Sequence, residues 1–294
     1  MKEIGIITNE SRDTDYTYTK TLANSIIKRG GRALMTDRLC EKAGIGEYCG
    51  DEEEVINHSD LVICLGGDGT FLKAARKVYI KELPILGINL GNLGFLAEVD
   101  KNDIDFAIEQ LFYNKYAIEE RMMLGAAIHR RGEATIHDIA LNDAVITRGA
   151  VSRIVHVKVY VNDIFVDSFP GDGLIVSSPT GSTAYSLSAG GPIVEPDTKL
   201  LLITPICPHI LYSRSFVINT DSVVKVVVDE DFDHSAMVAL DGEEGYSIRG
   251  GDSVEVTKSP YSIKLVKMNY RNFYSILRTK IYYKGESLKR DEVQ

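Results

Sequence analysis

The feature that most constrains the fold is a change of hydrophobic pattern near residue 118. From residue 1 to about 115, short apolar runs such as Ile4–Ile7 and Leu61–Leu65 alternate with segments of helical period. After Glu120, helical segments nearly vanish and strand-like runs follow one another, among them Thr135–Thr147, Val254–Thr257 and Ile263–Lys267. Alternation of strands and helices predicts a parallel sheet, whereas consecutive strands separated by turns predict antiparallel pairing.

We therefore expect an α/β plus all-β fold, with an N-terminal domain over residues 1–118 and a β-rich domain over 119–268. Within the second domain, Val159–Val166 is typical of a tight hairpin around Asn162 and Asp163. The last segment, 269–294, combines a helix and a polar tail. That helix is predicted by the spacing of its apolar residues, and we expect it to pack on the first domain: Tyr270, Phe273, Tyr274, Leu277 and Ile281.

Composition excludes several classes of protein. Hydrophobic residues make up 44% of the chain and charged residues 26%, so neither a disordered chain nor a fibre fits. A net charge of −9 disfavours nucleic acid and anionic membranes as main partners. No apolar run approaches the ~20 residues of a membrane-spanning helix, and we expect neither an export signal nor a membrane location. The cysteines at 40, 49, 64 and 207 have no C-x-x-C spacing, so we expect reduced thiols in a cytoplasmic protein.

The first candidate site is Gly66-Gly67-Asp68-Gly69-Thr70, which follows a buried strand and opens a helix. Glycines at the carboxyl end of a parallel strand let backbone N–H groups approach a phosphate, and the helix N-terminus adds positive charge. An ordinary turn with Asp68 as a helix cap fits the pattern equally well. The dinucleotide fingerprint lacks its third glycine here, and the chain has no Gly-Lys pair for a Walker A loop.

Two further segments carry candidate binding groups. Gly87–Phe95 is a second glycine-rich loop after a strand, a weaker signal because a plain connection looks similar. Ser177–Pro192 is dense in hydroxyls, which donate to ribose or phosphate, and Tyr185 offers a face for a base. Asp143 and Asp172 stand in segments where turn chemistry alone favours Asp. The six histidines show no zinc-site spacing, and no serine-hydrolase elbow is present.

Together these blocks resemble the NAD kinase family, from Ile4 to about Lys284. The motif at 66–70 alone is shared with 6-phosphofructokinases and diacylglycerol-type lipid kinases, whereas residues 92–95, 141–143 and 178–192 in combination resemble NAD kinases specifically. The resemblance implies a Rossmann-like domain followed by a β-sandwich, with the last helix returning to the first domain. It also implies a homo-oligomer, either a dimer or a tetramer.

The implied reaction is transfer of the ATP γ-phosphoryl group, or one from polyphosphate, to the 2′-hydroxyl of the adenosine ribose of NAD with a divalent metal such as Mg²⁺. Asp68 would accept the hydroxyl proton, and Gly69 would let the backbone approach the ligand closely. No metal ligand is implied. By motif match, the remaining implied binding residues are Phe95, Asn142, Asp143, Arg153, Asp172, Thr180, Thr183, Ala184, Tyr185, Ser186, Leu187, Ser188 and Glu243.

The chain departs from the family pattern at two positions. Pro170 stands two residues before Asp172, where many members carry Lys or Arg, so one cationic contact is missing. Glu243 falls where some bacterial members have Gln. Two alternative functions remain: a lipid or sugar kinase, which leaves Tyr185 and Asn142 without a role, and a non-catalytic NAD(P)-binding regulator, which an altered Asp68 would have favoured.

Overall fold

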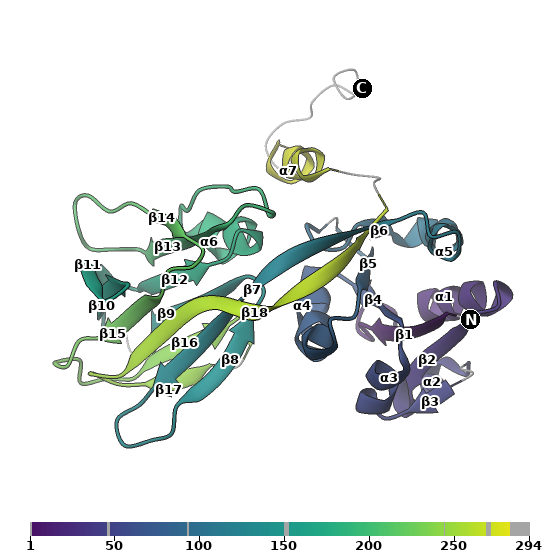
Figure 1. The fold of residues 1–294 in the computed structure, drawn as a ribbon, viewed down its shortest axis with the longest axis horizontal. Coiled ribbons are helices and arrows are strands. Elements are labelled where there is room, and N and C mark those ends of the chain that lie inside the picture. Colours follow the sequence, from purple (N-terminus) through teal and green to yellow (C-terminus); the bar gives the residue numbers. More distant parts are fainter. Residues whose placement is uncertain are drawn as a thin grey trace. The chain divides into compact units, whose positions relative to one another are not determined.

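The computed structural model describes residues 2–45, 48–92, 94–149, 153–243, 245–268 and 272–282, which form two units (Figure 1). Unit 1 comprises Met1–Glu120 with Ile263–Gln294, and unit 2 comprises Arg121–Ser262. The chain passes from one unit to the other within two long strands, β7 (Ala117–His129) and β18 (Ser253–Lys267). Unit 1 is α/β and unit 2 is antiparallel β, which confirms the expected fold class.

Unit 1 is built on a parallel sheet in the order β3-β2-β1-β4-β5. Its strands are β1 (Glu3–Thr8), β2 (Arg32–Thr36), β3 (Tyr48–Gly50), β4 (Leu61–Gly66) and β5 (Ile85–Asn89), extended by β6 (Val99–Asp100). The end of β18 joins β5, where Leu265 pairs in parallel with Ile85. The strand order reverses between β1 and β4, and such a switch point is where open α/β sheets bind ligands.

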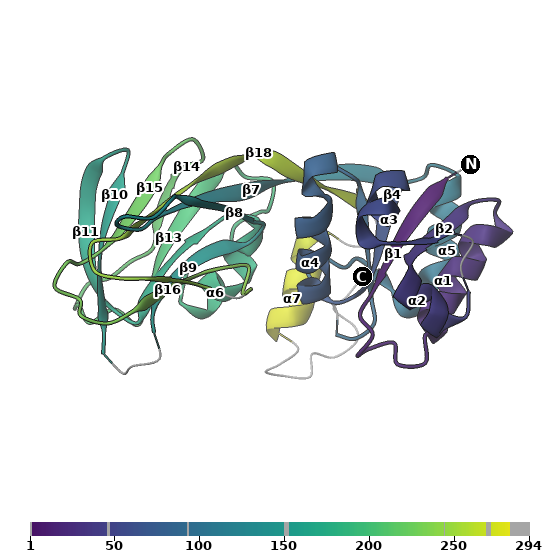
Figure 2. The ribbon, with the colours of Figure 1, turned by 90° about the horizontal axis from the view of Figure 1, so that it is seen from below.

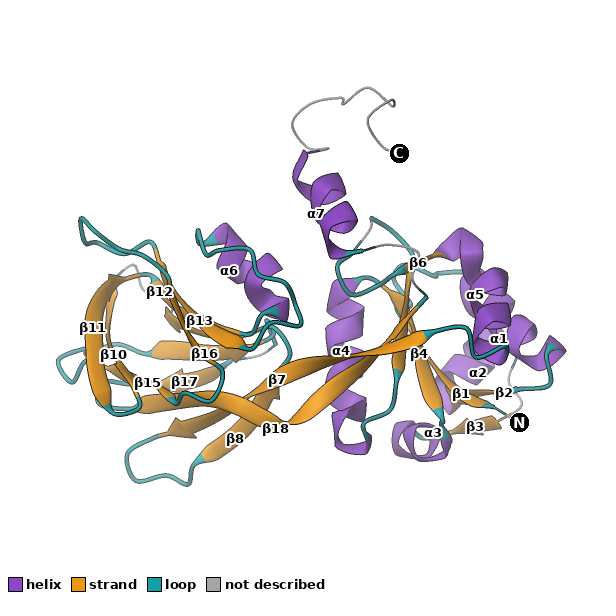
Figure 3. Ribbon diagram, turned by 45° about the horizontal axis from the view of Figure 1, so that its top comes forward, coloured by secondary structure: helices purple, strands orange, loops and turns teal. Residues whose placement is uncertain are grey.

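Helices cover both faces of this sheet (Figure 3). One face carries α1 (Thr17–Lys28), α2 (Asp37–Ala43) and α5 (Ile104–Phe112), whose apolar side chains share one buried cluster with β1, β2 and β4. The other carries α3 (Glu52–His58) and α4 (Asp68–Val78). Short 3₁₀ turns cover Tyr79–Lys81 and Lys101–Asp103.

Asp51 caps α3 through a capping box with Glu54, so the acidic run at 51–54 begins a helix as its pattern indicates. The last helix, α7 (Phe273–Tyr282), belongs to unit 1. Tyr270, the side chain of Ile281 and the polar tail lie outside the described residues. Within the described part of the chain, no helix is long and apolar enough to cross a membrane.

Two of the four cysteines form a disulfide, so the expectation of four reduced thiols was wrong. Cys40 of α2 and Cys49 of β3 are joined, with their Cα atoms 6.2 Å apart. The two residues meet because β3 pairs with β2, the strand that leads directly into α2. Cys64 and Cys207 are free thiols, and burial raises the pKa of the Cys64 thiol to about 12.

Unit 2 contains two antiparallel sheets (Figure 2). The two sheets share one apolar core. Val157 and Val226 from one sheet and Ile146 and Val176 from the other lie in the same buried cluster, which makes the unit a β-sandwich. Besides β7 and β18, its strands are β8 (Ile136–Ala140), β9 (Asp143–Arg148), β10 (Val155–Val161), β11 (Ile164–Gly171), β12 (Gly173–Ser177), β13 (Leu200–Ile206), β14 (Phe216–Asn219), β15 (Val224–Val228), β16 (Ala236–Leu240) and β17 (Tyr246–Ile248).

The predicted hairpin at 159–166 is confirmed. Asn162 and Asp163 both have positive φ, 51° and 63°, as the favoured two-residue turn requires. The apolar run at 135–147 is not one strand, because the chain leaves β8 after Ala140 and starts β9 at Asp143. Conversely, the runs at 254–257 and 263–267 belong to the single strand β18.

Candidate functional site

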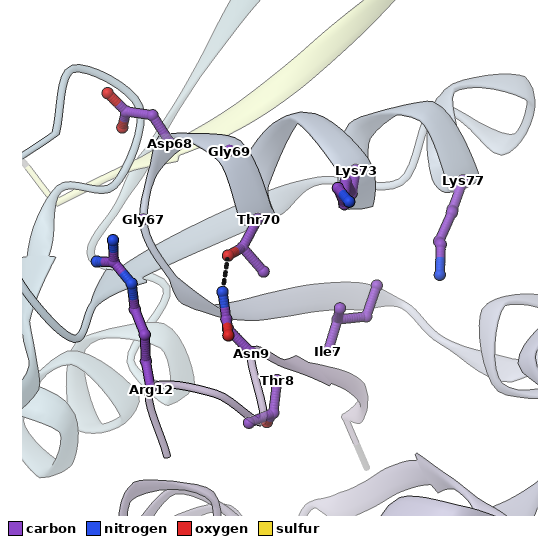
Figure 4. A pocket seen from close by; sticks show the side chains of 10 residues that line it. All are labelled: Ile7, Thr8, Asn9, Arg12, Gly67, Asp68, Gly69, Thr70, Lys73 and Lys77. Atoms are coloured by element: carbon purple, nitrogen blue, oxygen red, sulfur yellow. Dashed lines mark hydrogen bonds between the residues drawn. The ribbon is translucent and has the colours of Figure 1, made fainter. Parts of the chain in front are cut away.

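The loops after β1 and β4 enclose a pocket of about 470 Å³ at the switch point of the parallel sheet (Figure 4). Asn9 follows β1, and its Nδ2 donates a hydrogen bond of 2.9 Å to Thr70 Oγ1 in the first turn of α4. This bond joins the two loops. The pocket is lined by Ile7, Thr8, Asn9, Arg12, Gly67, Asp68, Gly69, Thr70, Lys73 and Lys77.

Three cationic side chains line this pocket. Lys73 and Lys77 come from α4, and Arg12 rises from the loop after β1 towards Gly67 (Figure 4). Lys77 forms an ion pair with Glu52, whereas no hydrogen bond or ion pair engages the Arg12 guanidinium within the described part of the chain. Together with the N-terminus of α4, these charges suit a ligand that carries several phosphates. None of these three cations was predicted from the sequence.

Asp68 ties two loops of unit 1 together. Its Oδ2 accepts a hydrogen bond of 2.9 Å from the Phe95 N–H, and its Oδ1 accepts from Leu96 at 3.0 Å and Ala97 at 3.4 Å. Asp68 does not cap its own helix, since Gly67 occupies the N-cap and no side chain caps it. The Asp68 side chain remains 31% exposed. A Cβ at Gly94 would collide with Asp68 Oδ1, so only glycine fits there.

Unit 1 thus brings together three of the implied site residues, Asp68, Gly69 and Phe95. The Phe95 ring is half-buried and lies 6.1 Å from the Phe273 ring of α7, measured between centroids. A Cβ at Gly69 would meet no atom within 4 Å, so the protein's own packing does not require glycine there. The backbone at this position is therefore open to a ligand.

The hydroxyl-rich segment of unit 2 forms a 3₁₀ turn, Thr180–Thr183, followed by one turn of helix, α6 (Tyr185–Ser188). Several of its hydroxyls hold the protein together. Ser178 Oγ donates to the Leu141 carbonyl at 2.6 Å, and Ser186 Oγ lies 3.1 Å from Thr204 Oγ1 with both residues buried. Thr180 is buried and accepts from a guanidinium N–H of Arg121 at 3.4 Å.

Other residues of the segment are more accessible. Tyr185 is 44% exposed and Ser188 is exposed, while Thr183, Ala184 and Leu187 are half-buried. The buried hydroxyls therefore form hydrogen bonds within the protein, and Tyr185 and Ser188 are the most accessible groups of the segment.

Asn142 and Asp143 are held by a carboxylate that the sequence analysis did not assign. Asp241 accepts backbone N–H bonds from Leu141 and Asn142 at 2.7 Å each and from Asp143 at 3.3 Å. Asp241 follows β16 directly and has a positive φ of 54°. Asp143 is 4% exposed, and its burial, followed by the charge of Asp241, raises the pKa of the Asp143 carboxyl to about 7.

Asp172 lies between β11 and β12 and is paired with a cation from another strand. Its Oδ1 accepts a hydrogen bond of 2.7 Å from Nε of Arg148, and this bond lowers the pKa of the Asp172 carboxyl. Pro170 leaves no cation two residues earlier, but Arg148 of β9 places one beside the carboxylate. Arg153 is exposed ahead of β10, and Glu243 is half-buried in the turn after β16.

Comparison with known proteins gives a consistent result. Family models described as the ATP-NAD kinase N-terminal and C-terminal domains match residues 4–116 and 141–268. The NAD kinase of Acetivibrio thermocellus is 55% identical, covering 98% of this chain and 100% of that protein. That of Ruminiclostridium cellulolyticum is 46% identical, covering 97% and 100%.

Solved structures show the same fold. Yeast NADH kinase complexed with NADH has a TM-score of 0.86 at 23% identity and covers 99% of this chain and 90% of that one. An NAD kinase from Archaeoglobus fulgidus in complex with ATP has a TM-score of 0.75 at 22% identity, covering 95% and 99%.

Proposed function

The chain belongs to the NAD kinase family, and we propose that it transfers the γ-phosphoryl group of ATP to the 2′-hydroxyl of the adenosine ribose of NAD, which gives NADP. The observation that carries this proposal is the cationic pocket at the switch point of unit 1. Its wall includes the carboxylate-bearing residue Asp68, three cations and the N-terminus of a helix. The cations that suit a phosphoryl donor and the residue that suits a proton acceptor therefore line the same pocket.

The pocket is the proposed site of the ATP phosphates. Arg12, Lys73 and Lys77 supply positive charge, and the open backbone at Gly69 lets N–H groups approach the phosphate oxygens. The Archaeoglobus fulgidus relative binds ATP, which supports ATP as the donor. Phosphoryl transfer depends mainly on positioning and charge stabilisation, and this pocket provides both.

Asp68 is the proposed proton acceptor. A ribose hydroxyl is a poor nucleophile, so a carboxylate that takes its proton while aligning it with the γ-phosphorus assists the attack. Backbone N–H groups fix the carboxylate from the side of residues 95–97, and about a third of the side chain stays accessible. The fixed orientation limits the reorganisation that the reaction requires.

Unit 2 is the proposed dinucleotide site, a role that the NADH complex of the yeast relative supports. Tyr185 would stack on the adenine, and Asn142 with Asp143 would hydrogen-bond polar groups of the ligand. In unit 2 the other proposed contacts are those implied by the motif match: Arg153, Asp172, Thr180, Thr183, Ala184, Ser186, Leu187, Ser188 and Glu243. In unit 1 the motif match adds Phe95 as a proposed ligand contact.

Mg²⁺ is the proposed metal, bound as a complex with ATP. Magnesium usually keeps several waters and is held by substrate phosphates with one or two carboxylates. Asp68 is one residue that lines the phosphate pocket, with its carboxylate bound by the N–H groups of residues 95–97, and within the described residues no group of three or more His, Cys, Asp or Glu side chains forms a cage. When bound, the metal would neutralise phosphate charge. The family resemblance also leads us to propose a homo-oligomer, dimer or tetramer, which light scattering in solution can test.

The decisive experiment measures NADP formation from NAD, ATP and Mg²⁺ with an NADP-specific dehydrogenase. The wild-type protein should turn over, and Asp68→Asn should lower kcat by roughly 10²- to 10⁴-fold while NAD binding persists. Asp103→Asn is the matched control, because Asp103 is exposed and its side chain makes no capping bond. Undiminished turnover in Asp68→Asn would remove Asp68 from the mechanism.

If the wild-type protein forms no NADP, its binding of NAD distinguishes between the two alternative functions. NAD binding without turnover, with ATP and with polyphosphate, would indicate a regulator. No NAD binding at all would direct attention to lipid or sugar substrates.

A further inference from the structure

The last helix of the chain places a cation on Asp68. Lys280 lies near the end of α7, and its Nζ is 3.7 Å from Asp68 Oδ2. The same ammonium lies 4.5 Å from the centroid of the Phe95 ring, within the range of a cation–π contact. Lys280 therefore contacts both the proposed proton acceptor and the residue whose N–H binds that acceptor.

Within unit 1, Asp68, Phe95 and Lys280 each contact the other two. Asp68 accepts the Phe95 N–H, the Phe95 ring receives the Lys280 ammonium, and the ammonium returns to the Asp68 carboxylate. The Phe95 ring also lies against Phe273, in the first turn of α7. Two residues of this helix, near its two ends, therefore contact the active-site loops.

A stabilising surface ion pair is the simplest alternative. Lys280 and Asp68 have side chains 33% and 31% exposed, and ion pairs at this exposure contribute little to stability. Moreover, the carboxylate already accepts three backbone N–H bonds, so it does not need a cation to satisfy its oxygens. The position of Lys280 needs another explanation.

The proposed reaction supplies one. The 2′-hydroxyl oxygen forms a bond to the γ-phosphorus while the bond from that phosphorus to the β,γ-bridging oxygen breaks, and the hydroxyl proton passes to Asp68. The anionic phosphoryl group must then pass close to an anionic carboxylate, and their repulsion raises the barrier. A fixed positive charge beside the carboxylate offsets that repulsion, and the protein does not need to reorganise during the step.

We propose that Lys280 is a positioning residue for phosphoryl transfer: through Asp68 and Phe95 it fixes the acceptor carboxylate and offsets its charge beside the transferred group. This inference rests on the proposed function. It assigns to α7, which lies far from the glycine motif in the sequence, a direct part in organising the active site.

The test compares Lys280→Met, which keeps the length of the side chain but removes its charge, with Lys280→Arg, which keeps the charge. We expect Lys280→Met to lower kcat by roughly 10- to 100-fold while KM for ATP and for NAD changes by less than about threefold. Lys280→Arg should recover most of the lost kcat. Arg278→Met is the matched control, because it removes an exposed cation from the same helix and should leave kcat unchanged.

A double-mutant cycle identifies the route of the effect. If Lys280 acts through Asp68, adding Lys280→Met to Asp68→Asn should cause no further loss of kcat. An undiminished kcat in Lys280→Met would overturn the proposal, as would a loss that adds fully to that of Asp68→Asn or that Lys280→Arg does not relieve.

Thermal unfolding of each variant checks the fold, and Lys280→Gln is the second neutral variant if Lys280→Met does not fold. A wild-type protein that makes no NADP would overturn the proposed function and this inference together. An active wild-type protein whose Lys280 variants behave as the control does would overturn this inference alone.

Discussion

Asp68 in unit 1 and Asp241 in unit 2 use the same structural device in different surroundings. Each follows a strand closely, and each accepts backbone N–H bonds from three consecutive residues of a distant loop, 95–97 for Asp68 and 141–143 for Asp241. Asp68, however, stays a third exposed at an open pocket beside Lys280. Asp241 has as its neighbour the buried carboxyl of Asp143.

The difference shows that anchoring a carboxylate does not by itself assign its role. Access to a ligand and the sign of the neighbouring charge decide what the anchored group can do. In unit 1 a cation and an open pocket suit a group that reacts beside phosphate. In unit 2 burial, and after it the charge of Asp241, raises the pKa of the Asp143 carboxyl to about 7.

The largest expected effect concerns the pH dependence of stability at Asp143. The folded-state pKa of about 7 lies above the unfolded value of ~3.9. Between these values the folded state holds a proton that the unfolded chain has released, so the free energy of unfolding falls as pH rises from about 4 to 7, by up to ~4 kcal/mol. Asp143→Asn should remove this slope in urea unfolding measured from pH 4.5 to 8.

Asp163→Asn in the exposed hairpin turn is the control, and it should retain the wild-type slope. If Asp143→Asn retains it as well, the buried carboxyl does not titrate in this range and the contrast with Asp68 is lost.

The second prediction removes the anchor of unit 2. Asp241→Ala leaves the N–H groups of Leu141, Asn142 and Asp143 without their acceptor, and it should lower the free energy of unfolding by roughly 2 to 3 kcal/mol. The measurement belongs at pH 5, where Asp143 is protonated and relief of carboxylate repulsion cannot mask the loss. The variant should also lower the pKa of Asp143, because the Asp241 charge no longer opposes its ionisation. A loss within about 0.5 kcal/mol would show that water replaces the anchor.

Local signals in the sequence were sufficient for much of the fold. The alternation of strands and helices before residue 118 and the turn formers at Asn162 and Asp163 depend on neighbouring residues alone, and each led to a correct prediction. The break between β8 and β9 at Leu141 was missed, because it depends on hydrogen bonds that the N–H groups of residues 141–143 donate to Asp241, about a hundred residues away in the sequence. The Cys40–Cys49 disulfide was missed because it depends on the pairing of β3 with β2.

In the candidate site, too, some residues can be recognised from the sequence and others only from the fold. Asp68 and Gly69 stand out as a motif, whereas Arg12, Lys73 and Lys77 are ordinary surface cations in the sequence. They become a phosphate pocket only when the sheet order places the loops after β1 and β4 together. Lys280 likewise could not be predicted from its neighbours in the sequence, because it reaches Asp68 only when the last helix returns to unit 1.

The third prediction tests the ligand assigned to unit 2. Tyr185→Ala should weaken dinucleotide binding by roughly 1 to 3 kcal/mol, the usual contribution of a stacked base, with little effect on ATP. Tyr185→Phe keeps the ring and is the control, so it should bind nearly as well as the wild type. Titration calorimetry with NAD measures both. Equal dissociation constants for Tyr185→Ala and the wild type would exclude stacking at this ring.

The smallest effect on stability is expected at Gly69. This residue lies in the first turn of α4 with open space around its Cβ position, and alanine favours a helix by up to ~1 kcal/mol, less near the end. Gly69→Ala should therefore raise the free energy of unfolding by about 0.5 kcal/mol while raising KM for ATP, because the new methyl group occupies the proposed phosphate approach. Gly94→Ala is the contrast: its Cβ would collide with Asp68 Oδ1, so both stability and kcat should fall. A Gly69→Ala variant with unchanged KM would mean that the phosphates do not approach the backbone there.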